Sequence, residues 1–208
     1  NYSNLNYEIR NSADMIIKNI FILISPFINI LFTFFLIIVF LFFAYYQYNY
    51  KKIKSINNFY YLLMVIESLF WSFLLIFAMQ SCSDLFLNIY RTFSISHDVY
   101  LSIGAGIWEE FLFRVMLIYF LSFIFLYLFK MNKTRTVLLA IFFSSILFSF
   151  FHYIGDLNDT FSWDSFTLRF IAGLILSVIY FFRGFGIATY THIFYDMSII
   201  IFSLITKR

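Results

Sequence analysis

The sequence predicts an all-α, polytopic membrane protein with about six transmembrane helices around an intramembrane polar cavity. Two observations lead to this fold class. Hydrophobic residues make up 62% of the 208 residues and charged residues only 12%, whereas a soluble domain carries about a quarter charged residues. The apolar residues also fall into runs of about 20, the length that a helix needs to cross the hydrocarbon core of a bilayer.

Six apolar runs are long enough to span a bilayer, and polar linkers separate them. Basic residues follow the first and third runs, at 51–54 and 130–135, and Arg183-Gly184 divides the fifth from the sixth. The stretch 80–98 is too polar to span. We expect transmembrane helices over residues 20–46, 59–79, 99–129, 136–154, 165–182 and 186–206.

The charge distribution indicates how the helices are oriented and what the chain does not bind. Basic linkers alternate with basic-poor loops, so the positive-inside rule places the basic linkers in the cytoplasm and the acidic loop 156–164 outside, with both termini. The net charge of +3 is spread over short loops, and no basic patch predicts a nucleic-acid partner. The sequence leaves the oligomeric state open.

No composition shift, repeat or soluble segment divides the chain, so we expect one membrane domain over residues 1–208. The single cysteine excludes an internal disulfide. The 33 Phe, with abundant Ile, Asn, Tyr and Lys, are typical of AT-rich genomes. We therefore expect an integral membrane protein of a bacterial cell membrane, in contact with membrane lipid.

A cluster of ionisable residues interrupts the third span, within the stretch Gly106-Ile-Trp-Glu-Glu-Phe-Leu-Phe-Arg114. Because a charge in the bilayer costs a few kcal/mol, it needs a partner or a function. Glu110 and Arg114 are spaced i,i+4 and share a helix face, which fits an ion pair that holds helices together. Glu109 points about 100° away, and its carboxylate in a low-dielectric site suits general acid or base chemistry.

Two further polar clusters lie on later spans. His152 ends the fourth span, and His192 and Asp196 are spaced i,i+4 on the sixth. Each histidine alone is more often a satisfied core residue, but three clusters on three spans are harder to attribute to structure alone. Together they fit a hydrolytic site or, since zinc uses these ligand types, a metal site. Glu67 and Arg169 are interpreted as structural or snorkelling residues.

The expected spans carry one geometric conflict. At 1.5 Å of rise per residue, His152 falls near the outer surface and His192 nearer the inner one, at opposite ends of any shared site. We therefore expect the helices to run differently from these ranges near residues 150 and 190.

Three motifs on separate spans give the chain a family resemblance. Glu109-Glu110-xxx-Arg114, Phe148-xxx-His152 and His192-xxx-Asp196 follow one another in order. They resemble the EExxxR, FxxxH and HxxxN motifs of the CPBP family of intramembrane proteases, which includes the CAAX prenyl endopeptidases and bacterial relatives linked to bacteriocin handling. The resemblance covers about residues 100–200, the family-like core of the domain.

The resemblance implies an intramembrane endopeptidase that hydrolyses a peptide bond of a membrane-associated substrate. Such a substrate would be a peptide or a lipidated protein, prenylated or cut near its C-terminus. Glu109 then corresponds to the general base, with His152 helping to activate water. Glu110 corresponds to the partner that Arg114 holds in place.

The same resemblance assigns His192 and position 196 to the oxyanion of the reaction. Asp196 departs from the commoner Asn, and an ionised Asp accepts hydrogen bonds but does not donate them. Four interpretations of Asp196 are therefore open: it is protonated, it orients His192, it helps to bind a metal, or the site is altered. The family has been described both as metalloproteases and as glutamate-based proteases, so the cofactor is zinc or none, and Glu109, His152 and His192 are the expected ligands of a metal.

Two other functions remain open. A non-proteolytic scaffold or bacteriocin immunity protein of the same family would use the polar cluster to bind a partner. An ion or proton pathway could be built from the same acids and histidines.

Overall fold

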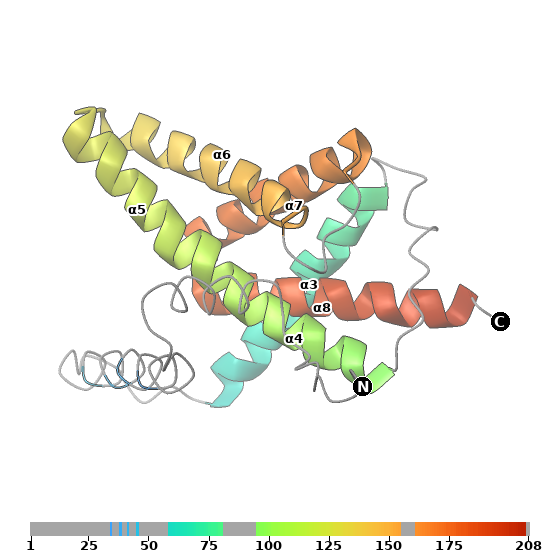
Figure 1. Ribbon diagram of the computed structural model, residues 1–208. Helices are drawn as coiled ribbons and strands as arrows, with labels where there is room; N and C mark the ends of the chain where they lie inside the picture. Colours follow the sequence, from blue (N-terminus) through green and yellow to red (C-terminus); the bar gives the residue numbers. More distant parts are fainter. Residues whose placement is uncertain are drawn as a thin grey trace, which may run out of the picture. The chain divides into compact units, whose positions relative to one another are not determined.

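The computed structural model describes residues 34, 38, 41, 45, 58–80, 95–154 and 161–206, and all regular secondary structure in these ranges is helical. The expected all-α class is confirmed for this part of the chain. Figure 1 shows the elements in order. They are α3 (Asn58–Gln80), α4 (Ile95–Glu110), η2 (Phe111–Leu117), α5 (Ile118–Phe123), η3 (Ile124–Leu128), α6 (Lys133–Phe151), α7 (Trp163–Arg183) and α8 (Phe185–Thr206).

Five helices are long and apolar enough to cross a membrane, among the residues that the structure describes. They cover 58–80, 99–128, 133–151, 163–183 and 185–202. Each lies within about three residues of an expected span at its start, which reflects the polar linkers that end the apolar runs. The first expected span, 20–46, lies outside the described residues apart from four positions.

The chain divides into two compact units, residues 1–63 and 64–208. In the first unit, four described residues up to position 45 are helical, and their side chains are exposed. They are Phe34, Ile38, Leu41 and Tyr45. The second unit contains every residue discussed below. The single domain over 1–208 stays a prediction.

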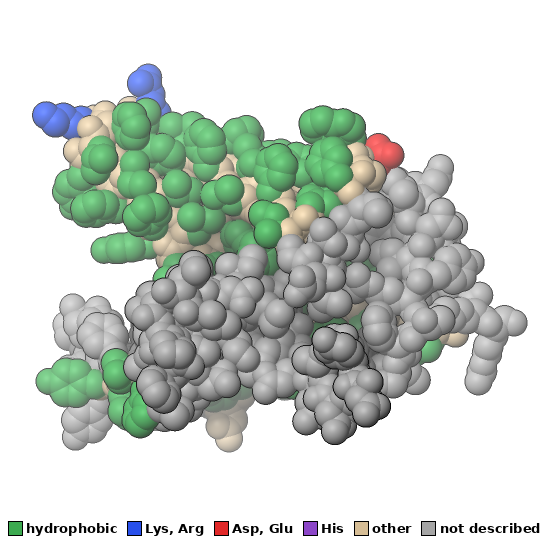
Figure 2. Space-filling model, in the orientation of Figure 1, with side chains coloured by type: hydrophobic (Ala, Val, Ile, Leu, Met, Phe, Trp, Pro, Cys, Tyr) green, Lys and Arg blue, Asp and Glu red, His purple; other side chains and the backbone are tan. Residues whose placement is uncertain are grey.

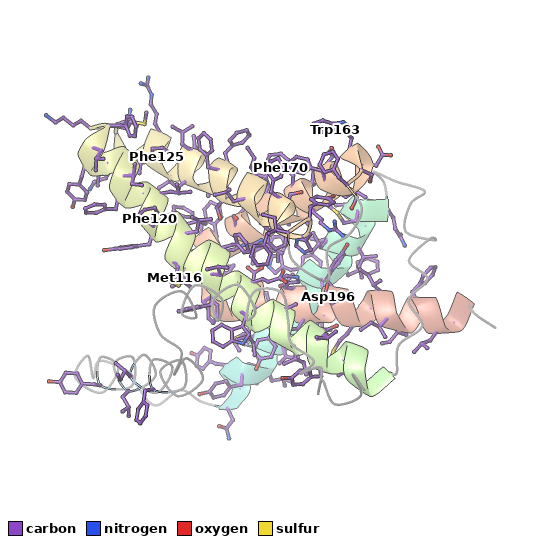
Figure 3. The ribbon with its side chains drawn as sticks, in the orientation of Figure 1. Met116, Phe120, Phe125, Trp163, Phe170 and Asp196 are labelled. Atoms are coloured by element: carbon purple, nitrogen blue, oxygen red, sulfur yellow. The ribbon has the colours of Figure 1, made fainter. Side chains whose placement is uncertain are left out.

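The elements α4, η2, α5 and η3 follow one another without a break over residues 95–128 and form one long helical rod in the second unit. Its membrane-spanning part is 30 residues long, or about 45 Å at the rise of an α-helix. That length exceeds the ~30 Å hydrocarbon core, so the rod must tilt or extend beyond it. In Figure 1 it runs obliquely across α8. Met116 and Phe120, which are exposed, point away from the other helices in Figure 3.

A tight turn reverses the chain between η3 and α6. Lys130 has a φ of 49° in this turn, and the Asn132 side chain caps α6 by accepting from the Arg135 backbone N–H at 2.9 Å. The returning helix packs beside the rod, with the rings of Phe125 and Phe143 5.9 Å apart. Figure 2 shows basic side chains gathered at this turn, while Asp164 lies in the first turn of α7.

The helices α3, α7 and α8 form the apolar part of the core. Leu75 and Met79 of α3 pack against Ala172 and Leu176 of α7. A second cluster joins Ile179 of α7 to Ile187 and Ala188 of α8. The turn between α7 and α8 uses Gly184 with a φ of 86°, a conformation that a side chain disfavours.

The depth conflict predicted from the sequence is resolved by helix crossing. We expected the helices to differ from their ranges near residues 150 and 190. The fourth span ends at Phe151, three residues early, but α8 runs without a break from Phe185 through His192, so the expectation at 190 is wrong. Counting rise assumes parallel helices, whereas the rod crosses α8 obliquely (Figure 1). When helices are tilted, residues at different distances from the ends of their own spans can lie close together, as His152 and His192 do.

The crossing of α4 and α8 depends on one glycine. A Cβ atom at Gly106 would lie 2.3 Å from Cγ1 and 3.2 Å from the backbone nitrogen of Ile193. No side chain larger than hydrogen fits there without moving one helix. Because Ile193 adjoins His192, this close approach also sets how near His192 comes to the glutamates of α4.

We expect Gly106→Ala to lower the free energy of unfolding by about 1–3 kcal/mol, the usual cost of overpacking. Thermal unfolding in detergent micelles would measure the loss. Gly186→Ala is the matched control, since its Cβ would meet Met64 Sδ at an ordinary 3.4 Å. Equal melting temperatures for the two variants would contradict the assignment, and Ile193→Ala should restore part of the loss at Gly106→Ala.

Candidate active site

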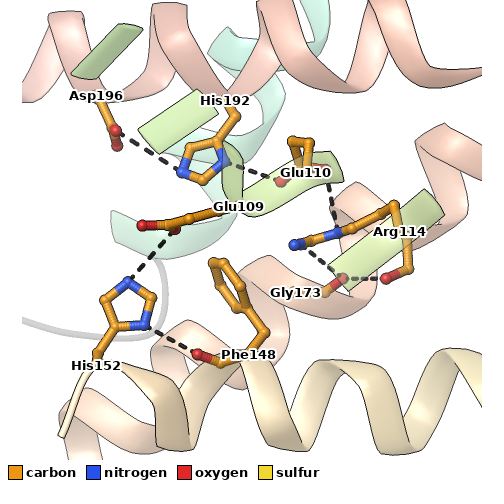
Figure 4. Close-up of polar contacts among 9 residues, drawn as sticks. Glu109, Glu110, Arg114, Phe148, His152, Gly173, His192 and Asp196 are labelled. Atoms are coloured by element: carbon orange, nitrogen blue, oxygen red, sulfur yellow. Dashed lines mark hydrogen bonds and ion pairs between the residues drawn. The ribbon is translucent and has the colours of Figure 1, made fainter. Parts of the chain in front are cut away.

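Glu110 is a buried carboxylate with a neighbour at each of its two oxygens. Its side chain is fully buried. One oxygen, Oε2, lies 3.1 Å from Arg114 Nε, and the other, Oε1, lies 2.9 Å from His192 Nδ1. Both oxygens therefore have a charged or ring-nitrogen neighbour (Figure 4). Because Arg114 balances its charge, Glu110 accepts the hydrogen bond and His192 Nδ1 donates it.

Arg114 is buried through contacts with three other elements. Its Nη2 donates to the carbonyl oxygen of Gly173 on α7 at 3.4 Å, and its Cζ lies 4.4 Å from the centre of the Phe148 ring on α6. The residue belongs to the π-helical segment η2, which starts directly after Glu110. Such segments are often found at functional sites. On the same segment, the carbonyl of Phe113 accepts from Ser144 Oγ of α6 at 2.7 Å.

Glu109 faces a different neighbour. It is 4% exposed, and its Oε2 lies 3.8 Å from His152 Nε2. His152 stands at the end of α6, and its Nδ1 lies 2.9 Å from the carbonyl oxygen of Phe148. A carbonyl only accepts, so Nδ1 carries a proton, and in its neutral form the ring would present a lone pair at Nε2 toward Glu109.

The gap between Glu109 and His152 suits one water molecule. A water oxygen about 2.8 Å from each atom would form a triangle with the 3.8 Å separation of Oε2 and Nε2. Such a water would donate one hydrogen to the carboxylate and one to the ring. Its lone pairs would then point away from both groups, as a nucleophile requires.

His192 lies between Glu110 of α4 and Asp196 of its own helix. Its Nε2 lies 3.7 Å from Asp196 Oδ2, which is longer than a hydrogen bond. With Nδ1 donating to Glu110, Nε2 can donate to a third group only when both ring nitrogens carry protons. Glu110 and Asp196, on either side of the ring, would balance the charge of that form.

All six residues singled out in the sequence meet in this cluster (Figure 4). Glu109 meets His152, while Glu110 meets His192 and Arg114, and Asp196 lies beside His192. Four elements contribute: α4, η2, α6 with the residue that ends it, and α8. The structure also adds residues that the sequence did not single out, namely Gly173 and Ser177, whose hydroxyl donates to the Gly173 carbonyl at 2.7 Å.

The expected metal ligands were Glu109, His152 and His192. Among the described residues, no three His, Cys, Asp or Glu side chains are grouped so that they could hold a metal ion. His192 presents its Nδ1 to Glu110, and His152 its Nδ1 to a backbone carbonyl. Such Nδ1 contacts are also typical of histidines that bind a metal through Nε2, so the misfit to zinc lies in how the described side chains are grouped, and the chemistry proposed below uses the side chains alone.

Glu67 forms an ion pair away from this cluster. It binds the guanidinium of Arg183 through both carboxylate oxygens, and it accepts from Trp71 Nε1 at 3.3 Å. The side chains of Glu67 and Arg183 are 26% and 50% exposed. This pair ties α3 to the end of α7 and agrees with the structural interpretation of Glu67.

Comparison with known proteins gives one match. Residues 91–198, slightly more than half of the chain, match the family model described as "Type II CAAX prenyl endopeptidase Rce1-like". The matched region contains the whole polar cluster. No curated protein and no solved structure matches the chain.

We expect Arg114→Met to destabilise the protein by about 3–5 kcal/mol, because it leaves Glu110 buried without its charge partner. Arg183→Met is the matched control. It also breaks a Glu–Arg pair, but an exposed one, and should cost only about 0–1 kcal/mol. Thermal unfolding of both variants in the same detergent measures the difference. Adding Glu110→Gln to Arg114→Met should reduce the loss, because it removes the unpaired charge. Equal losses for the two single variants would show that burial of the pair does not matter.

Proposed function

Because this chain belongs to the type II CAAX prenyl endopeptidase Rce1-like family, a family of intramembrane CAAX-type endopeptidases, we propose that it is a peptidase that cleaves a membrane-associated peptide or lipidated protein. The chain is an integral membrane protein, with five described helices that can span a bilayer. The substrate is prenylated or cut near its C-terminus, and Glu109 and His152 activate the water.

The observation that carries this proposal is the contact between Glu109 Oε2 and His152 Nε2 at 3.8 Å. It brings together two proton acceptors from different helices, both within hydrogen-bond reach of one water, as a general base requires. Glu110 is committed to Arg114 and His192, so Glu109 is the acid of the pair that has a catalytic geometry.

The reaction then proceeds by direct attack of water. The water oxygen bonds to the carbonyl carbon of the scissile peptide, and Glu109 takes one of its protons. The carbonyl oxygen becomes an oxyanion, to which doubly protonated His192 donates from Nε2. As the C–N bond breaks, the proton held by Glu109 passes to the leaving amine. The products are a carboxylic acid and an amine, and transfer of the acid proton to the amine gives a carboxylate and an ammonium.

Glu110 and Arg114 support the reaction without touching the substrate. Glu110 holds His192 at 2.9 Å and so fixes the direction in which Nε2 points. Arg114 balances the charge of Glu110 at 3.1 Å. A lipid-linked substrate would reach the site from the bilayer, since the spans expose large apolar side chains such as Phe120 and Tyr119.

Glu109→Gln should lower kcat by about 100-fold or more, because the amide keeps the shape of the side chain but does not take the proton from water. Cleavage of a quenched fluorescent peptide with a farnesylated cysteine four residues from its carboxyl end would measure it, with the protein in lipid vesicles. Glu67→Gln, which removes a carboxylate remote from the site, should cleave at the wild-type rate.

The same experiment separates the proposed function from its alternative. A non-proteolytic scaffold or immunity protein of the same family would not cleave the peptide, and its binding or protective activity should survive Glu109→Gln. Normal cleavage by Glu109→Gln would rule out the role of Glu109 as the base.

Asp196→Asn should leave the protein active. Asp196 lies beyond hydrogen-bond distance from His192, at 3.7 Å, so its charge is not committed to a tight pair. The Asn amide could also donate to the oxyanion. We expect about the wild-type kcat for Asp196→Asn and a lower kcat for Asp196→Ala, measured on the farnesylated peptide. A large loss in both would show that the negative charge is required.

A further inference from the structure

We propose that Phe148 is a positioning residue that keeps Arg114 paired with Glu110 and thereby leaves Glu109 to act with His152. The inference rests on the proposed function and extends it to a residue outside the acid and base groups. It starts from the contacts of a single buried ring on α6.

Phe148 touches both halves of the polar cluster. It is 3% exposed. One ring face lies under the guanidinium of Arg114, with Cζ 4.4 Å from the ring centre. The ring centres of His152 and His192 lie 5.0 Å and 6.1 Å away, both in edge-to-face arrangements. In Figure 4 the Phe148 ring lies between His152 and Arg114.

Helix geometry alone does not fix which glutamate Arg114 binds. Arg114 is four residues from Glu110 and five from Glu109. In an α-helix the first spacing would win, but Arg114 belongs to the π-helical segment that begins at Phe111. Residues five apart approach one another in a π-helix, and Arg114 lies within electrostatic range of both carboxylates.

The Phe148 ring removes this ambiguity. A guanidinium donates hydrogen bonds in its own plane, so a ring on its face leaves the in-plane donors for other groups. Nη2 donates to the Gly173 carbonyl at 3.4 Å, and Nε lies 3.1 Å from Glu110 Oε2 in the ion pair. To reach Glu109, Arg114 would have to leave the ring and lose the cation–π contact.

The backbone of Phe148 acts on the other half of the cluster. Its carbonyl holds His152 Nδ1 at 2.9 Å, which turns Nε2 toward Glu109. The Phe148 ring packs edge-to-face against Phe113, with ring centres 5.3 Å apart, and its place depends on Gly173, where an added Cβ would lie 3.1 Å from Cδ1 of the ring. The ring of Phe148 thus directs Arg114 to Glu110, and its carbonyl directs His152 to Glu109.

Phe148→Leu tests the ring, with Phe113→Leu as the matched control. Phe113 is also 3% exposed and packs in the same aromatic group, so both variants lose similar packing. The hydrophobic reagent dicyclohexylcarbodiimide modifies protonated carboxyl groups in membranes, and tandem mass spectrometry would give the ratio of labelled Glu109 to labelled Glu110.

We expect Phe148→Leu to lower the ratio of Glu109 to Glu110 labelling by roughly fivefold, the change that loss of an ordinary cation–π contact makes in an equilibrium. Phe113→Leu and the ring-retaining Phe148→Tyr should keep the wild-type ratio. The same ratio in both leucine variants would overturn the inference. If Phe148→Leu fails to fold, as shown by its thermal unfolding, Phe148→Met supplies a ring-free side chain of similar volume.

Activity gives an independent reading. On the farnesylated peptide, Phe148→Leu should lower kcat by roughly the same factor with KM unchanged, and Phe113→Leu should not, when both are assayed well below their melting temperatures. A kcat loss shared equally by the two variants would indicate a packing role alone. Absence of cleavage by the folded wild type would contradict the proposed function, while the labelling ratio would still decide the role of Phe148.

Discussion

The polar centre of this membrane protein depends on the buried pair of Glu110 and Arg114. Ionisable groups are costly inside a bilayer unless they are paired, and this pair makes Glu110 tolerable at zero exposure. Glu110 in turn holds His192, and Arg114 lies over Phe148. The pair therefore connects the rod of α4 and η2 to α6, α7 and α8.

Adjacent residues in this centre have different neighbours because a helix turns about 100° per residue. Glu110 faces the helices that enclose the pair, whereas Glu109 faces the end of α6 and His152. The proposed hydrolysis uses this divergence, since an acid engaged by an arginine is a poor base. A step of one residue along the helix therefore separates the acid of the ion pair from the acid that the proposed hydrolysis uses.

Much of the fold and the site could be predicted from the sequence, for identifiable reasons. Apolar runs broken by basic linkers gave the described spans to within a few residues, and the spacing of Glu110 and Arg114 predicted their contact. The motifs predicted that His152 and His192 share a site, but the spans alone placed them at opposite ends of it, because their meeting depends on the oblique crossing of α4 and α8 and the close approach at Gly106. Phe148 belongs to the second motif, but its contact with Arg114 was not predicted, since the motif gives no spacing between residues on different helices.

The three motifs share a spacing of four residues, and in the structure each spacing is a contact. Glu110 reaches Arg114, the Phe148 carbonyl reaches His152, and His192 lies beside Asp196. The three residues between the named positions therefore set a separation of about one helical turn. A chain that carried the same six side chains with a single residue inserted or deleted inside any motif would keep the letters and lose the corresponding contact, so the length of the gap is as much a part of the site as the residues at its ends.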